Sequence, residues 1–304
     1  CSVCYSLFMQ NALIRIIFVL LPIVCQAASS SMPSEKPASG VENSMDRPHQ
    51  GSLKVLSLNV AHGRKDALNQ VFLKKADFEN NLAVIAEMLV ASDADIVALQ
   101  EADGPSYWSG EFDHVAALAE DANYSWFERA SHAQSLVFDY GTALLSRQPF
   151  EEVLNHTFEP SPPTMSKGLI LGQIRWQSVG NPGKAQLVDV ISVHLDFSRK
   201  KVRQQQIGEI VQALKERYHP AIILGDFNSD WFSEASIVKE LAEKASLQVY
   251  RPEATDLGTY KDGGKRLDWI LISEELEFLD YRVLPDVVSD HRAVFAEIGF
   301  RNEK

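Results

Sequence analysis

The feature that most constrains the fold is a series of short apolar runs separated by helical patterns. Each run is four to ten residues long and rich in Val, Ile, Leu or aromatic residues, which is typical of buried β-strands. Several runs alternate apolar and polar residues, and this pattern predicts sheets packed face to face with helices outside them. The predicted strands are 54–58, 95–99, 142–146, 169–176, 186–194, 221–224, 267–272 and 293–300.

Between these runs, apolar residues recur at the three- and four-residue spacing of a helix that buries one face. Leu82, Ile85 and Leu89 form one such stripe. The predicted helices are 77–91, 112–122, 200–217 and 233–245. The chain has no evident internal repeat, and strands resume directly after the Pro-rich loop at 159–167. We therefore predict a single α/β domain.

Polar side chains stand at or beside the ends of six predicted strands. They are Asn59, Glu101, His194, Asp226 with Asn228, Asp268, and Asp290 with His291. A single case indicates only a solvated turn, but a carboxylate beside a buried run is costly unless it is paired or binds a cation. Six cases together indicate a shared site. Oxygen donors select Mg²⁺, Mn²⁺ or Ca²⁺ over zinc, and two histidines suit proton transfer or contact with a phosphoryl oxygen.

The same stretches resemble, in order, the motifs of the endonuclease/exonuclease/phosphatase superfamily. The matching stretches are Leu56-Ser-Leu-Asn-Val-Ala-His-Gly63, Ala98-Leu-Gln-Glu101, Gly141-Thr-Ala-Leu-Leu-Ser-Arg147, Ser192-Val-His-Leu-Asp196, Gly225-Asp-Phe-Asn228, Arg266-Leu-Asp-Trp-Ile270 and Ser289-Asp-His-Arg292. The resemblance implies a four-layer α/β sandwich, in which two mixed β-sheets pack face to face with helices on both outer faces. It also implies a metal-dependent phosphoesterase site at one end of the sandwich.

The resemblance further implies which residues hold the metal. Glu101 is similar to the principal ligand, Asn59 lies beside it, and Asp290 matches the metal and water region. The implied cofactor is Mg²⁺, with Mn²⁺ or Ca²⁺ as alternatives.

Five residues match positions with catalytic roles in the superfamily. Asp226 is similar to the residue that orients or deprotonates the attacking water, and Asn228 would hold it and the phosphate in line. His291 would contact a non-bridging phosphoryl oxygen, and Asp268 would fix its tautomer. His194 occupies a position that is His in deoxyribonuclease I-like members, sphingomyelinases and inositol phosphatases but typically Tyr in AP endonucleases. It would protonate the leaving oxygen or bind the phosphate.

Other candidates lie on neighbouring loops. His62 and Arg64 follow Asn59 and could reach a substrate phosphate, although a solvated loop is an equal alternative. The loop with Tyr107 and Trp108 could form one wall of the pocket or simply pack against the body.

The N-terminal region differs from the body. Residues 1–27 combine Arg15, an apolar run at 16–24 and the small residue Ala27, as in a cleaved signal peptide. A lipoprotein signal ending at Cys25 is the weaker alternative. Residues 28–51 are predicted to be a disordered linker, and the domain would comprise residues 52–304. All three cysteines lie before residue 26, which excludes a disulfide framework or a cysteine nucleophile in the body.

Charge and composition reduce the number of functional classes that fit this chain. The chain is 45% hydrophobic, with a formal net charge of -12, which disfavours tight non-specific nucleic-acid binding. We expect a monomeric periplasmic or secreted phosphoester hydrolase without a stable membrane span after cleavage. Its substrate would be a small or lipid-derived phosphodiester or phosphomonoester, attacked in line by an activated water. The alternatives are a secreted deoxyribonuclease I-like nuclease acting on nucleic acid, and a catalytically silent cation-binding protein of the same fold.

Overall fold

The computed structural model describes residues 48–301 except 66, 68–72, 178–184 and 262. The predicted signal peptide and most of the predicted linker lie outside the described residues. The end of that linker differs from the prediction, because His49–Gln50 forms strand β1 and pairs in parallel with Trp176 and Gln177. The fold therefore begins before Ser52. These two polar residues join the sheet through backbone pairing, which leaves no apolar pattern in the sequence.

One sheet has seven strands, in the order β1-β7-β8-β9-β11-β10, and β6 also pairs with β7, on the edge away from β8. Its strands are β1, β6 (Glu152–Thr157), β7 (Gly168–Gln177), β8 (Ala185–His194), β9 (Ala221–Asp226), β10 (Leu247–Val249) and β11 (Asp268–Ser273). The pairing is mixed: β8 and β9 are parallel, whereas β7 and β8 are antiparallel.

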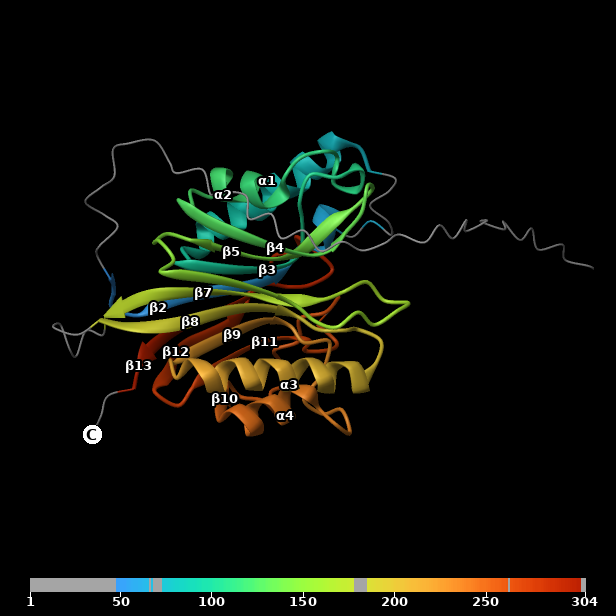
Figure 1. The fold of residues 1–304 in the computed structure, drawn as a ribbon. Coiled ribbons are helices and arrows are strands. Elements are labelled where there is room, and N and C mark those ends of the chain that lie inside the picture. Colours follow the sequence, from blue (N-terminus) through green and yellow to red (C-terminus); the bar gives the residue numbers. More distant parts are fainter. Residues whose placement is uncertain (1–47, 66, 68–72, 178–184, 262, 302–304) are drawn as a thin grey trace, which may run out of the picture. The chain divides into compact units, whose positions relative to one another are not determined.

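The second sheet has six strands in the order β12-β13-β2-β3-β5-β4 and is also mixed. Its strands are β2 (Leu53–Asn59), β3 (Ile96–Asp103), β4 (Trp126–Gln134), β5 (Asp139–Ser146), β12 (Leu276–Val283) and β13 (Val294–Phe300). Figure 1 shows the two sheets stacked face to face.

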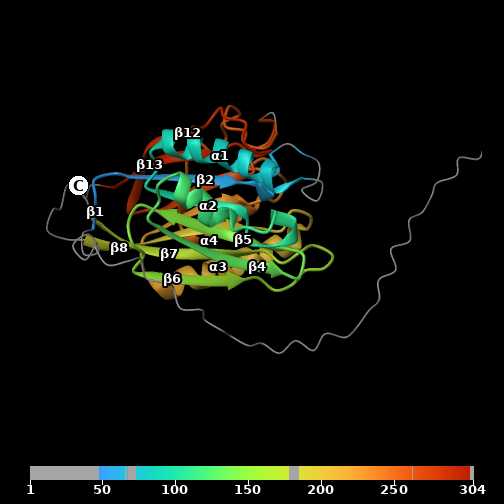
Figure 2. The same cartoon turned by 90° about the horizontal axis from the view of Figure 1, so that it is seen from above.

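Four α-helices of the described residues cover the outer faces. They are α1 (Lys75–Ser92), α2 (His114–Asp121), α3 (Lys200–Arg217) and α4 (Ile237–Ala245). Helices α1 and α2 lie on the six-stranded sheet, as Figure 2 shows from above, and α3 and α4 lie on the seven-stranded sheet. The predicted sandwich is confirmed. Helix α4 begins later than predicted because the hydroxyl of Ser236 accepts from the N–H of Lys239 and caps it there. None of the helices in the described ranges is long and apolar enough to cross a membrane.

Strand alternation divides the apolar residues among three cores. In β2, Val55 faces the opposite sheet, whereas Leu56 and Leu58 pack under α1 and α2. In β9, Leu224 points between the sheets and Ile223 points toward α3 and α4. Because successive side chains of a strand point to opposite faces, each central strand contributes to two apolar layers.

Candidate active site

Strand register places three predicted site residues side by side. Asp226 ends β9, and it pairs across the parallel β8 with His194 and across the antiparallel β11 with Asp268. This alignment depends on Gly225, because a Cβ built there would lie 1.9 Å from the carbonyl oxygen of Val193. The glycine thus permits the close approach of β8 and β9 that fixes the site.

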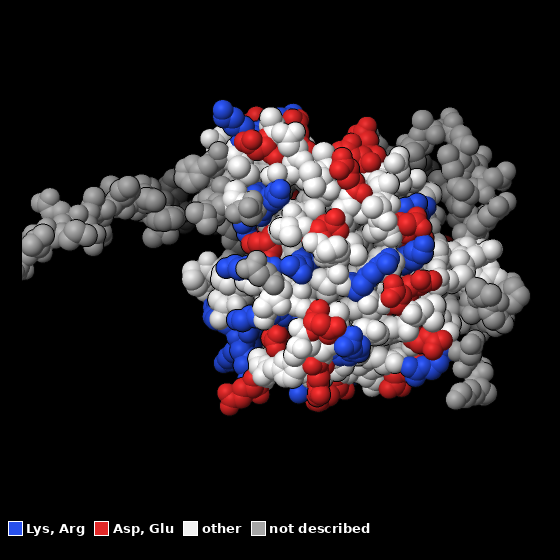
Figure 3. All heavy atoms as spheres, turned by 180° about the vertical axis from the view of Figure 1, so that it is seen from behind, with Lys and Arg blue, Asp and Glu red and all other residues white. Residues whose placement is uncertain are grey.

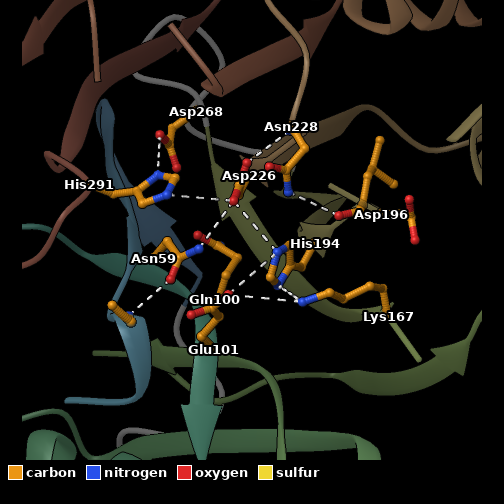
Figure 4. A network of polar contacts seen from close by, with 12 residues as sticks. Asn59, Gln100, Glu101, Lys167, His194, Asp196, Asp226, Asn228, Asp268 and His291 are labelled. Atoms are coloured by element: carbon orange, nitrogen blue, oxygen red, sulfur yellow. Dashed lines mark hydrogen bonds and ion pairs between the residues drawn. The ribbon is translucent and has the colours of Figure 1, made fainter. Parts of the chain in front are cut away.

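Glu101 reaches the site through a β-bulge in β3. The pairing with β5 shifts between Gln100 and Ala102, and Glu101 has a φ of 51°. In a regular strand, Glu101 would face the helices, as its neighbour Leu99 does. An extra residue in a bulge re-aims its side chain, so the irregular backbone turns this carboxylate toward the other site residues (Figure 4).

Asp226 lies at the centre of the polar network (Figure 4). Its Oδ2 accepts from Nδ2 of Asn59 at 3.1 Å, and its Oδ1 accepts from the backbone N–H of Asn228 at 2.8 Å. Burial raises the pKa of this carboxyl to about 7, and the positive charge of His291 only partly offsets the effect. The group can therefore take up and release a proton near neutral pH.

His291 lies on the Asp268 side of the network. Its Nδ1 is 2.8 Å from Oδ2 of Asp268, and its Nε2 is 3.9 Å from Oδ2 of Asp226. Burial by itself would lower the pKa of His291, but Asp268 and Asp226 outweigh it and raise the pKa to about 10. The hydroxyl of Thr259 donates to the same Oδ2 of Asp268 at 2.6 Å. The imidazole is thereby held as a cation with Nε2 directed toward Asp226.

His194 is held in the opposite charge state. Its Nε2 is 3.5 Å from Oδ2 of Asp226 and 3.9 Å from Oε1 of Glu101, and its Nδ1 is 3.3 Å from Nζ of Lys167. Burial, followed by the charge of Lys167, holds the pKa of His194 well below its ordinary value. An ammonium group can only donate. Lys167 therefore donates to Nδ1 of a neutral His194, whose hydrogen is on Nε2.

Glu101 lies among basic groups and is one-fifth exposed. Its Oε2 is 3.3 Å from Nε2 of His62, whose Nδ1 is 2.8 Å from Oδ1 of Asp103. Burial opposes ionisation of Glu101, but the charges of His62 and Lys167 outweigh it and hold its pKa far below the ordinary value. Glu101 is thus a carboxylate at any physiological pH. The predicted substrate-binding residue His62 contacts this carboxylate directly.

Arg64 contacts a predicted metal ligand. Its Nη2 donates to Oδ2 of Asp290 at 2.7 Å, and its Nη1 donates to the carbonyl oxygen of Ala67. Asp290 is anchored to β2 through its neighbour, because the hydroxyl of Ser289 donates to the carbonyl oxygen of Asn59. The structure thus brings all ten predicted residues to one end of the sandwich, while their chemical roles stay predictions.

The sequence analysis did not identify two residues of this network, Lys167 and Thr259. Lys167 directly precedes β7, whose first residue, Gly168, pairs with His194 at the end of the antiparallel β8. The only sequence signal for Lys167 was its position as a charged residue directly before an apolar run. Thr259 lies in a loop, and no sequence pattern relates it to Asp268.

Comparison with known proteins now identifies the family. The model of the endonuclease/exonuclease/phosphatase family matches residues 56–291, well over half of the chain. The chain belongs to this family. Its members are phosphoester hydrolases. No curated protein sequence matches the chain.

Solved structures of the family share the fold. An endonuclease/exonuclease/phosphatase family protein from Leptotrichia buccalis is 19% identical with a TM-score of 0.63, over 82% of this chain and all of that one. A mannosyl-6-phosphatase of Bacteroides thetaiotaomicron is 19% identical with a TM-score of 0.61, over 82% and 100% of the two chains. The catalytic domain of human Nocturnin, with bound sulfate, is 20% identical with a TM-score of 0.59, over 83% and 94%. At these identities, the similarity establishes the fold alone.

The donor set fits the divalent cation that is typical of this family. Asp226, Asp268 and His291 offer ligand atoms that lie within 4.8 Å of one another. Oδ1 of Asp268 is buried without a hydrogen-bond partner, as expected of an oxygen that a cation or water would satisfy. This cluster differs from the predicted ligands, Glu101, Asn59 and Asp290, and consists of residues predicted to be catalytic. The two carboxylates of this cluster suit a hard cation, whereas the protonated imidazole of His291 has no lone pair with which to coordinate one.

Proposed function

We propose that this protein is an exported, monomeric, Mg²⁺-dependent phosphoester hydrolase that works in the periplasm or outside the cell. The observation that supports this most is the central position of Asp226 between a cationic and a neutral imidazole. A carboxyl with a pKa of about 7 suits a general base. A nearby imidazolium suits the charge that develops on a phosphoryl group during attack.

Each side chain would then have a separate role. Asp226 would accept the proton of the attacking water on Oδ2, while Asn59 and Asn228 keep the carboxylate in place. His291 would donate from Nε2 to a non-bridging phosphoryl oxygen, since Asp268 keeps it protonated.

His194 would donate from Nε2 to the phosphate or to the leaving oxygen. Bound Mg²⁺, held by Glu101, Asn59 and Asp290 with Mn²⁺ or Ca²⁺ as alternatives, would supply electrostatic stabilisation of the phosphoryl oxygens.

The substrate we propose is a small or lipid-derived phosphoester, with nucleic acid as the alternative. The net charge of -12 disfavours a polyanion. On the face shown in Figure 3, basic and acidic side chains are interspersed over most of the described surface.

Hydrolysis of bis-p-nitrophenyl phosphate and p-nitrophenyl phosphate, with and without EDTA, tests the proposal. We expect turnover that EDTA abolishes and Mg²⁺ restores, and a roughly 10²- to 10⁴-fold lower kcat/KM in Asp226→Asn and His291→Gln. Asp256→Asn is the matched control, because its exposed carboxylate only pairs with Arg251.

Two results would contradict the proposal. If the wild type shows no metal-dependent turnover and equals Asp226→Asn, the chain is a cation-binding protein. Cleavage of plasmid DNA or RNA at far higher kcat/KM than either ester would establish the nuclease alternative. Export is tested separately by fractionating cells that express the full chain.

A further inference from the structure

One short loop contacts all three predicted metal ligands. We call residues 59–64, at and directly after the end of β2, the ligand loop. Its contacts are those of the N–H of Ala61 with Oδ1 of Asn59 at 2.9 Å, Nε2 of His62 with Oε2 of Glu101 at 3.3 Å, and Nη2 of Arg64 with Oδ2 of Asp290 at 2.7 Å. The three ligands come from distant segments of the chain, and a single loop holds side chains from all of them.

The backbone of the ligand loop is strained and firmly held. Ala61 and His62 have φ values of 47° and 57°, a left-handed conformation that costs roughly 1–3 kcal/mol for a residue other than glycine. The N–H of Gly63 donates to the carbonyl oxygen of Val60 at 2.9 Å, and Nδ2 of Asn81 on α1 donates to the carbonyl oxygen of Gly63 at 2.9 Å. Strain of this kind persists only where the surrounding structure fixes it, and it is concentrated at functional sites.

Both ring nitrogens of His62 face carboxylates. Nδ1 lies 2.8 Å from Oδ1 of Asp103, while Nε2 makes the contact with Glu101. The ring of Tyr140 meets the imidazole edge-on, with the two centroids 5.0 Å apart, and Asp103 is only 2% exposed. Asp103 thus fixes the imidazole, and the imidazole directs the Glu101 carboxylate. No ring nitrogen of His62 is left to bind a phosphoryl oxygen.

Glu101 depends on this contact for its orientation. Its Oε1 lies 3.9 Å from Nζ of Lys167 and 3.9 Å from Nε2 of His194, distances that are too long for a hydrogen bond. The 3.3 Å approach of His62 to Oε2 is the shortest of the three ion pairs of Glu101. A group that orients a ligand in this way contributes to metal affinity although it does not touch the metal.

Arg64 supports Asp290 in a similar way. Its second terminal nitrogen, Nη1, donates to the carbonyl oxygen of Ala67 at 2.8 Å, so the guanidinium is held on the side away from the carboxylate as well. The side chains of Arg64 and Asp290 are 20% and 22% exposed, and partial burial strengthens an ion pair relative to a fully solvated one. Both terminal nitrogens of Arg64 therefore bond within the protein.

We infer that the ligand loop is a preformed template for the divalent cation. In it, His62 and Arg64 are positioning residues that hold two of the carboxylate ligands and do not bind the substrate. This inference rests on the proposed metal-dependent hydrolase function, and it replaces the substrate-binding role predicted for these two residues from the sequence. It also assigns the cation to the three predicted ligands and not to the cluster around Asp226.

The test measures the binding of Mn²⁺ alone to the metal-free full chain by isothermal titration calorimetry, separately from catalysis. The variants are His62→Gln, Arg64→Gln and Arg64→Lys, and Glu101→Gln is the positive control for loss of the cation. Hydrolysis of bis-p-nitrophenyl phosphate at increasing Mg²⁺ gives the second readout. Urea unfolding of the metal-free forms shows whether a variant keeps its fold.

Two control variants break similar contacts outside the polar network. His156→Gln removes an imidazole that lies 2.6 Å from Glu209 of α3. Arg282→Gln removes a guanidinium that lies 3.7 Å from Asp280 on β12. Both controls should equal the wild type in Mn²⁺ affinity and in turnover.

We expect the Mn²⁺ affinity to fall about tenfold in His62→Gln and in Arg64→Gln, because loss of a group that orients a ligand costs roughly 10- to 100-fold. The direction is informative, since removal of a nearby positive charge would by itself tighten the binding of a cation. Arg64→Lys should lie between Arg64→Gln and the wild type, because an ammonium lacks the planar fork of Arg. The Mg²⁺ concentration for half-maximal hydrolysis should rise in proportion, while KM at saturating Mg²⁺ changes less than about twofold.

Several results would overturn the inference. His62→Gln and Arg64→Gln might bind Mn²⁺ as tightly as the wild type or more tightly. A higher KM at saturating Mg²⁺, with unchanged Mn²⁺ affinity, would make the two residues substrate-binding. Mn²⁺ binding that survives in Glu101→Gln would place the cation in the cluster around Asp226, and a wild type without Mn²⁺ binding would remove the template altogether. If the variants bound Mn²⁺ more weakly but the wild type hydrolysed no ester, only the proposed hydrolase function would be refuted.

Discussion

The replacement of Thr259 by Val removes one hydroxyl from the support of His291. The Thr259 side chain is fully buried. Its Oγ1 donates to Oδ2 of Asp268 at 2.6 Å and accepts from the backbone N–H groups of Leu267 and Asp268 at 3.0 and 3.1 Å. Since Val has nearly the shape of Thr, the substitution leaves no cavity. Its effect is therefore the loss of three hydrogen bonds.

The magnitude follows from those three bonds. Each of the two N–H groups costs about 1–3 kcal/mol when it loses its partner, so the free energy of unfolding should fall by roughly 2–6 kcal/mol. Thr259→Ser keeps the hydroxyl and loses only a buried methyl group, which costs about 1 kcal/mol. In Thr259→Val, the loosened Asp268 should hold His291 less well. We expect kcat/KM to fall roughly tenfold, which corresponds to about 1.4 kcal/mol.

Urea unfolding followed by circular dichroism, together with Mg²⁺-dependent hydrolysis of bis-p-nitrophenyl phosphate, measures both effects in the three forms. The order of stability should be wild type, Thr259→Ser and then Thr259→Val. If Thr259→Val were as stable and as active as Thr259→Ser, the hydroxyl would not support Asp268, and this account of how His291 is held would be wrong.

Three further predictions concern the scaffold. Gly225→Ala should unfold at lower urea concentration and lose activity, because its Cβ would meet the carbonyl oxygen of Val193 at 1.9 Å. If the variant were as stable and as active as the wild type, Gly225 would not be needed for the close approach of β8 and β9. Arg217→Met should lower the free energy of unfolding by about 3–5 kcal/mol, because it leaves the fully buried Asp189 without its charge partner, and a loss below 1 kcal/mol would contradict this. Burial lowers the pKa of His132 to about 3. The unfolded chain therefore binds a proton more readily below pH 6.5, and stability should fall by about 1.4 kcal/mol per pH unit from there toward pH 3; urea titrations of His132→Gln should show a shallower fall.

The strands and helices with strong apolar patterns were predictable from the sequence. Helix α3 has the predicted bounds, and β8 differs by one residue. Strands β1, β4, β6, β10 and β12 were not predicted. In β6, Glu152–Thr157, five of six residues are exposed, so edge pairing and not burial holds the strand. Such a strand carries little of the hydrophobic signal on which sequence prediction depends.

Part of the candidate site was also predictable from the apolar pattern of the strands. Asp226 and His194 directly end apolar runs, and a costly group at a buried strand end is visible in the sequence. Lys167 and Thr259 were missed because their importance comes from contacts with distant residues, His194 for Lys167 and Asp268 for Thr259. The opposite charge states of His194 and His291 were also not predictable, since Lys167 faces one imidazole and Asp268 the other.

The sequence alone determined the class of fold, the family resemblance and the identity of the polar residues, because hydrophobic periodicity and motif order are properties of the linear chain. The tertiary structure decided which of these residues meet. Register between β8, β9 and β11 aligns His194, Asp226 and Asp268, and a bulge turns Glu101 toward them. It also decided that the β4–β5 turn meets the loop after β3, where the N–H of Trp108 donates to the carbonyl oxygen of Val137. Contacts between distant segments depend on packing and backbone geometry, and a sequence pattern records neither.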